Sequence, residues 1–206
     1  MSTRDDERRA RANETPIVGS LPQVPGILVA MRLAPALATH LRGLADALLV
    51  DDFPGASLTR AERELIATAV SAANDCFYCM DSHGAFASEL LRRADVPGIE
   101  PLVDGIKAGG SVGLSPKVAA LVHIARIVQR RSRDVTRADV EAALSAGATD
   151  GDTQLAVLIA SAFCMYNRMV DGLRASTPAS DLAYRERAAQ IAEHGYSDPR
   201  IGAIPQ

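Results

Sequence analysis

The chain carries apolar residues at the three- and four-residue spacing that is typical of helices packed on one face. Between residues 26 and 50 this pattern is interrupted by Pro35, which predicts one kinked helix or two short ones. From Leu65 to Ala73 the side chains are apolar or small on every side, so other helices are expected to enclose this one. Further helices are predicted at residues 76–94, 99–108, 116–129, 138–144, 154–170 and 179–193. The pattern predicts an all-α fold, a compact bundle of about seven to eight helices.

One helix start is well marked in the sequence. Thr59 and Glu62 have the spacing of a capping box, in which each side chain satisfies a backbone N–H group that the helix start leaves open. Asn74 and Asp75 are expected to end this helix, and Asp75 can cap the next one, with Cys76 in its first turn. A hinge between two helices is therefore predicted just before Cys76.

The length of 206 residues allows one sizeable core, and a single helical domain is expected over residues 24–195. Residues 1–23 are polar, charged and interrupted by proline, which predicts a flexible N-terminal arm, and residues 196–206 are expected to form a tail. Residues 1–16 resemble neither a secretory signal nor a transit peptide, so a cytoplasmic protein is expected. The longest apolar run, 155–166, is far shorter than the roughly 20 residues that cross a bilayer.

The amino-acid composition limits the classes of molecule that this protein is expected to bind. The formal net charge is −3 and charged residues make up 23% of the chain, so no strong field exists to hold nucleic acid or an anionic membrane surface. Aromatic residues make up 4% and tryptophan is absent, which favours closely packed helices over sheets. Three cysteines in a chain without a signal peptide argue against a structural disulfide framework, and a close pair among them indicates catalysis or metal binding.

The close pair is Cys76 and Cys79, a C-x-x-C motif where a helix is predicted to begin. Open N–H groups and the positive end of the helix dipole there favour thiolate, which predicts a lowered pKa for at least one of the two cysteines. His83 lies one helical turn after Cys79, where its imidazole can exchange a proton with a sulfur. Glu64 lies on the preceding enclosed helix, where burial without a partner would cost several kcal/mol. A proton-sharing contact with the thiol and the imidazole is therefore expected.

The spacing of these four residues resembles a known family. The segment Leu58 to Leu91, with the phrase LTRAERELIATAVSAANDCFYCMDSH, is similar to alkyl hydroperoxidase D-like members of the carboxymuconolactone decarboxylase superfamily, and especially to its peroxidase-related branch. Weaker similarity runs from Leu114 to Leu173. The resemblance implies an all-α fold, assembly into trimers or hexamers, and a thiol pair that reduces organic hydroperoxides with electrons from a dithiol donor. It implies no cofactor.

The resemblance also implies a role for each residue. Cys79 would attack the peroxide, Cys76 would resolve the product, and Glu64 with His83 would relay protons. One position departs from the family pattern, since the best-known members carry a second histidine where this chain has Tyr78. The unperturbed pKa of a phenol, about 10, makes Tyr78 a poor proton shuttle at neutral pH. The reductant and substrates of those members are therefore not assumed for this chain.

Three functions remain open from the sequence. The leading hypothesis is a thiol-dependent peroxidase or disulfide reductase that uses Cys76 and Cys79 with Glu64 and His83. The second is a structural zinc module in which the same four side chains are the ligands. The third, which follows from the wider superfamily, is a decarboxylase or lactone-acting enzyme whose activity would not depend on the cysteines.

Overall fold

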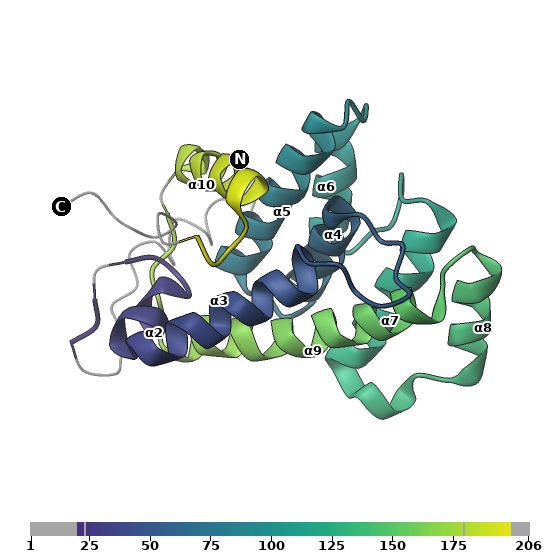
Figure 1. Ribbon diagram of the computed structural model, residues 1–206, viewed down its shortest axis with the longest axis horizontal. Helices are drawn as coiled ribbons and strands as arrows, with labels where there is room; N and C mark the ends of the chain where they lie inside the picture. Colours follow the sequence, from purple (N-terminus) through teal and green to yellow (C-terminus); the bar gives the residue numbers. More distant parts are fainter. Residues whose placement is uncertain (1–19, 23, 179, 199–206) are drawn as a thin grey trace.

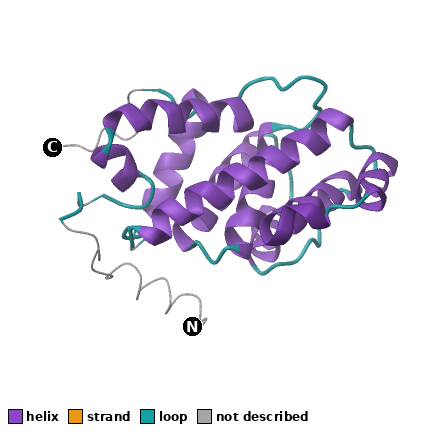
Figure 2. Ribbon diagram, turned by 90° about the horizontal axis from the view of Figure 1, so that it is seen from below, coloured by secondary structure: helices purple, strands orange, loops and turns teal. Residues whose placement is uncertain are grey.

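The computed structural model describes residues 20–22, 24–178 and 180–198, and this part of the chain consists of helices and loops without a strand (Figures 1 and 2). The predicted all-α fold is thereby confirmed. In chain order the helices are α2 (Leu28–Leu33), α3 (Pro35–Leu49), α4 (Arg60–Ala73), α5 (Phe77–Arg93), α6 (Ile99–Lys107), α7 (Pro116–Arg131), a 3-10 turn (Ser132–Asp134), α8 (Arg137–Ser145), α9 (Asp150–Gly172) and α10 (Asp181–His194). Most of the predicted N-terminal arm and of the predicted tail lies outside the described residues.

The region around Pro35 forms two helices, α2 and α3. Ala34 separates them in a non-helical conformation, with φ −136° and ψ 84°. A proline disfavours the helical conformation in the residue before it and fits well at the first position of a new helix. Of the two arrangements that the sequence allowed, the chain therefore adopts two short helices rather than one kinked helix.

Capping side chains set the starts of several helices. In the predicted box at α4, the Thr59 N–H donates to Glu62 Oε2 over 2.8 Å and the Glu62 N–H donates to Thr59 Oγ1 over 3.2 Å. Thr149 and Asp152 form a similar box at α9, which therefore begins at Asp150, earlier than the apolar pattern predicts. Local polar contacts thus fix the residue at which each of these two helices begins.

Helix α4 lies at the centre of the molecule and packs against α5, α7 and α9. Every residue from Arg63 to Ser71 is buried, which confirms the predicted enclosure of this helix. Small side chains such as Ala67 and Ala69, both fully buried, let the neighbouring helices approach closely. Glu64 lies on this helix and is held in the interior with 1% of its surface exposed.

The turn between α4 and α5 differs from the prediction in one detail. Asp75 is exposed and adopts a left-handed conformation, with φ 55°, so it does not cap α5. Cys76 takes the N-cap position instead, in an extended conformation, and its N–H donates to the Ser71 carbonyl over 3.0 Å. The left-handed residue Asp75 turns the chain before α5. Cys76 therefore lies just before the first helical residue, Phe77, rather than in the first turn.

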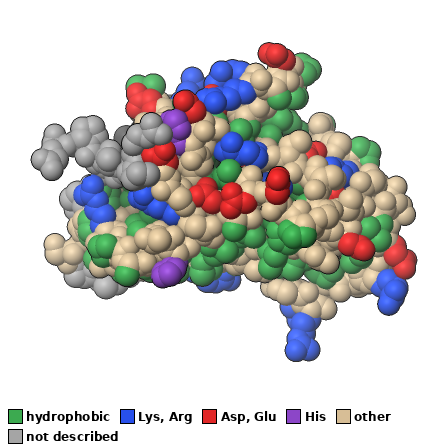
Figure 3. Space-filling model, in the orientation of Figure 1, with side chains coloured by type: hydrophobic (Ala, Val, Ile, Leu, Met, Phe, Trp, Pro, Cys, Tyr) green, Lys and Arg blue, Asp and Glu red, His purple; other side chains and the backbone are tan. Residues whose placement is uncertain are grey.

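Segments that are far apart in the sequence meet around α5. Helix α10 packs against α5, while α2 and α3 contact each other and α9 (Figure 1). On the face shown in Figure 3, acidic and basic side chains are interspersed and apolar side chains gather over α3 and α9. None of the described helices has the length and apolar character needed to span a membrane.

Candidate active site

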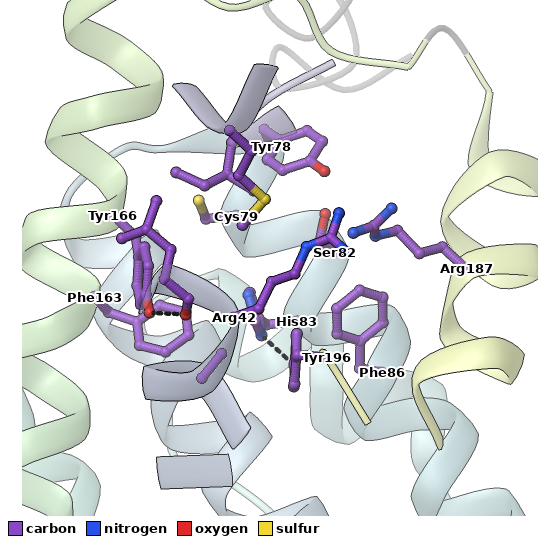
Figure 4. A pocket seen from close by; sticks show the side chains of 14 residues that line it. Arg42, Tyr78, Cys79, Ser82, His83, Phe86, Phe163, Tyr166, Arg187 and Tyr196 are labelled. Atoms are coloured by element: carbon purple, nitrogen blue, oxygen red, sulfur yellow. Dashed lines mark hydrogen bonds between the residues drawn. The ribbon is translucent and has the colours of Figure 1, made fainter. Parts of the chain in front are cut away.

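One cavity of about 50 Å³ lies among α2, α3, α5, α9 and α10 (Figure 4). Aromatic rings form much of its wall: Phe86, Phe163, Tyr166 and Tyr196. Cys79, Ser82 and His83 of α5 also line it. A cavity of this size can hold a few water molecules or the reactive end of a small organic substrate.

The two cysteines occupy different places relative to this cavity. Cys79 lines it and is 3% exposed, whereas Cys76 is fully buried and does not line it. Neither forms a disulfide in this structure. A hydrogen bond joins the two thiol groups, and Cys79 is on the side that a substrate can reach.

The pKa of Cys76 is raised, first by a side-chain hydrogen bond to Cys79 and then by burial. The sequence predicted a lowered pKa for at least one of the two cysteines, and for Cys76 the direction is the opposite. Burial and the shared hydrogen bond outweigh the helix dipole at this position. Cys76 thus remains a protonated thiol that can donate to the Cys79 sulfur.

Glu64 and His83, predicted to share a proton, are in direct contact. His83 Nδ1 lies 2.7 Å from Glu64 Oε2, and His83 is 12% exposed at the cavity while Glu64 is buried. The imidazole packs edge-on against Phe163, with ring centroids 4.5 Å apart and an interplanar angle of 89°. The carboxylate and the aromatic contact together hold the imidazole in one orientation at the cavity that Cys79 also lines.

Tyr196 completes this cluster, and the sequence analysis did not identify it. Its hydroxyl donates to the other Glu64 oxygen, Oε1, over 2.6 Å and lies 3.4 Å from His83 Nδ1. Burial, followed by the charge of Glu64 and the hydrogen bond to it, raises the pKa of Tyr196, so the phenol keeps its proton. The sequence signal that could have indicated Tyr196 is a single aromatic residue among small and polar residues after the last helix.

The segment after α10 is held in place by α3. Asp46 accepts a hydrogen bond from the Tyr196 N–H to Oδ1 over 2.6 Å and another from the Ser197 N–H to Oδ2 over 2.8 Å. Gly195 adopts a positive φ of 74°, which lets the chain turn away from the end of the helix. These contacts direct the Tyr196 ring into the site.

The chain is similar to one known protein family and to solved structures. The carboxymuconolactone decarboxylase family matches residues 35–90. A solved uncharacterized peroxidase-related protein from Ralstonia eutropha JMP134, described as an alkylhydroperoxidase AhpD core, is 27% identical over 90% of this chain and 91% of its own, with a TM-score of 0.65. Residues 35–90 therefore carry the match to the carboxymuconolactone decarboxylase family, and the chain as a whole is similar to an alkylhydroperoxidase AhpD core.

A second solved structure shares the fold of this group. It is an uncharacterized peroxidase-related protein from Silicibacter sp. TM1040, 24% identical over 79% of each chain, with a TM-score of 0.65. No curated protein matches the chain. The comparisons therefore give a family match over residues 35–90 and a shared fold, and the chemistry of this protein has to be argued from its own residues.

Tyr78, at the position where the best-known alkyl hydroperoxidase D-like members carry a histidine, is a wall residue of the cavity. Its ring packs on Gly26, which has a positive φ of 56° and where any side chain would overlap the ring. The Tyr184 ring lies on another side, with centroids 6.1 Å apart. Burial is the largest cause of the raised pKa of Tyr78. The phenol therefore holds its proton and fills space.

The zinc hypothesis finds no ligand set in the described part of the chain. There, no three side chains among histidine, cysteine, aspartate and glutamate are grouped as a metal ion would require. Glu64 and His83 are instead bonded to each other. The described geometry thus joins these two residues by a hydrogen bond, and it offers no support for metal ligation by them.

Replacing Tyr196 with phenylalanine is expected to lower the rate of the site's reaction by roughly 10- to 100-fold, because a hydrogen bond to the buried Glu64 carboxylate is lost while the ring remains. The matched control is Tyr166→Phe, which removes another buried phenol of the same cavity whose partner is the Leu41 carbonyl, 2.8 Å away. The two variants are compared by kcat/KM for a hydroperoxide and by thermal unfolding. Equal losses of kcat/KM in both would show that Tyr196 acts only by packing.

Proposed function

We propose that this protein is a thiol-dependent peroxidase that reduces organic hydroperoxides with Cys79 and Cys76 and is recharged by a dithiol donor. The observation that carries the proposal is one cavity lined by both Cys79 and His83, with His83 Nδ1 2.7 Å from the buried Glu64 carboxylate. The peroxidase-related relatives support the same class of reaction. The aromatic and apolar walls suit an organic substrate.

The first step forms a sulfenic acid. The Cys79 thiolate attacks the terminal oxygen of the hydroperoxide, a sulfur–oxygen bond forms and the oxygen–oxygen bond breaks. The sulfur is oxidised and the peroxide is reduced. His83, which has taken up the Cys79 proton, gives it to the departing alkoxide, and Glu64 stabilises the charged imidazole in between. The product of this step is an alcohol.

The second step closes the disulfide. Cys76, a protonated thiol hydrogen-bonded to Cys79, attacks the sulfenic sulfur; the sulfur–sulfur bond forms, and the hydroxyl leaves as water with the Cys76 proton. One hydroperoxide and two thiols thus give one alcohol, one water and one disulfide. A dithiol donor reopens the disulfide by exchange and is itself oxidised.

The test uses the purified, reduced protein and cumene hydroperoxide. We expect one hydroperoxide to be consumed for each two thiols lost, and added dithiothreitol to restore the thiols and sustain turnover. The control is Cys164→Ser, which removes the third cysteine and is expected to leave this stoichiometry unchanged, since Cys164 lies on α9 away from the cavity lining. Hydroperoxide loss no faster than in buffer, or loss without thiol oxidation, would refute the proposal.

A further inference from the structure

Two arginines border the cavity that contains Cys79. Arg42 comes from α3 and Arg187 from α10, two helices that are far apart in the sequence. Figure 4 shows both guanidinium groups directed toward the same side of the cavity, near Ser82. The proton-relay chemistry described above uses neither of them.

The two guanidinium groups are close enough to repel each other. The pKa of Arg42 is lowered, first by burial and then by the positive charge of Arg187. Neither arginine forms a hydrogen bond or an ion pair with another residue in the described part of the chain. A pair of partly buried like charges costs free energy unless an anion lies between them.

The rest of the cavity lining indicates what else a ligand with such an anionic group would contain. Ser82, which is 2% exposed, adds a hydroxyl group on the side of the arginines. The remaining walls are apolar or aromatic and include Met31 and Phe163. A ligand that fits has an apolar body and one anionic group, for which two guanidinium groups and a hydroxyl supply the donors.

We propose that the substrates of this protein are hydroperoxides that carry a carboxylate, which Arg42 and Arg187 bind while the peroxide group reaches Cys79. This inference rests on the proposed peroxidase function and adds the substrate class to it. A carboxylate has one charge and two oxygens in a plane, which two arginines and a small cavity can accommodate without further cations.

The test compares two hydroperoxides that differ only in the anionic group: cumene hydroperoxide and its para-carboxylate derivative. The wild-type protein is expected to have a kcat/KM roughly 10- to 100-fold higher for the carboxylate form. In Arg42→Gln and Arg187→Gln this ratio is expected to fall toward one. The matched control is Arg185→Gln on the same helix, because Arg185 is exposed and borders a different cavity; its ratio is expected to equal that of the wild type.

A second measurement tests anion binding by the two arginines independently of the thiol chemistry. Calorimetry with 4-isopropylbenzoate, which has the carboxylate but no peroxide, is expected to show binding that weakens roughly tenfold or more in either arginine variant. Stronger binding of inorganic phosphate than of 4-isopropylbenzoate would overturn the carboxylate assignment.

The outcomes separate this inference from the function on which it rests. If both hydroperoxides are consumed at equal kcat/KM, the peroxidase stands and the substrate class is wrong. If neither is consumed, the peroxidase proposal falls and the substrate class falls with it. A preference for dihydrolipoate over dihydrolipoamide as reductant, without a preference between the hydroperoxides, would assign the arginines to the electron donor and overturn the inference.

Discussion

Replacement of Cys79 with serine is expected to reduce hydroperoxide consumption to the uncatalysed rate, whereas replacement of Cys76 with serine is expected to leave a single turnover. Cys79 lines the cavity and supplies the attacking sulfur in the proposed mechanism, and no other described cysteine borders that space. Cys76 is fully buried, and the proposed mechanism needs it only to close the disulfide. The two variants should therefore differ although both remove one thiol of the same pair.

The difference can be measured with dimedone, which reacts with sulfenic acids. After one equivalent of cumene hydroperoxide, Cys76→Ser is expected to carry one dimedone adduct at Cys79, and the wild-type protein is expected to carry a disulfide instead. Thermal unfolding of each variant shows whether the buried serine has disturbed the fold. Full consumption by Cys79→Ser would end the thiol mechanism.

Replacement of Asp152 with alanine is expected to destabilise the fold by about 3–5 kcal/mol. This aspartate is fully buried and accepts four hydrogen bonds: from the Ser57 N–H over 2.6 Å, the Ser57 hydroxyl over 2.8 Å, the Leu58 N–H over 2.9 Å and the Thr149 N–H over 3.0 Å. It joins the start of α9 to the segment before α4, where the backbones of Gly151 and Gly55 approach so closely that a side chain on Gly151 would overlap them. Alanine leaves the Leu58 N–H buried without an acceptor and removes the acceptor of the three partly buried donors from Ser57 and Thr149.

Urea denaturation measures this loss, and Asp139→Ala is the matched control. Asp139 occupies the same capping-box position at α8, but its side chain bonds only to Thr136 and to an exposed His123 among the described residues. A clearly smaller change in the denaturation midpoint is expected for the control. Equal changes in the two variants would mean that Asp152 stabilises only its own helix start.

Asp152 also gives stability a defined dependence on pH. Burial acts to raise its pKa, but hydrogen bonds from Thr149 and Ser57 together lower it below the usual value of 3.8. A carboxyl group whose pKa is lower in the folded state stabilises the fold fully above its unfolded pKa, and this contribution is lost as the pH falls through the folded value. The wild-type protein should therefore lose stability below about pH 4 more steeply than Asp152→Asn.

Sequence patterns predicted the features that depend on neighbours along the chain. The box between Thr59 and Glu62 marks the start of α4 because both partners lie within one helical turn. Cys79 and His83 line one cavity because four residues return the helix to the same face. The contact between Glu64 and His83 was expected because a short hinge joins their two enclosed helices. Local spacing was sufficient in each case.

Features that depend on the path of the chain between helices could not be predicted in this way. The left-handed conformation of Asp75 decides which residue caps α5, and an aspartate alone does not reveal it. Tyr196 reaches Glu64 because α10 packs on α5 and Asp46 binds the segment that follows. Arg187 reaches the cavity through the same packing. These contacts cannot be read from residue spacing in the sequence, because each depends on the tertiary arrangement of the helices.

The hydrogen bonds from the Tyr196 and Ser197 N–H groups to Asp46 make the site depend on a segment outside the helices. The hydroxyl that completes the Glu64 and His83 pair comes from a residue beyond the last helix, and two main-chain hydrogen bonds to one carboxylate keep it there. A truncation or a fused tag that displaces this short segment would remove the Tyr196 hydroxyl while the helices keep their own backbone hydrogen bonds. Far-ultraviolet circular dichroism would then report a helical protein in which Glu64 and His83 have lost their tyrosine partner.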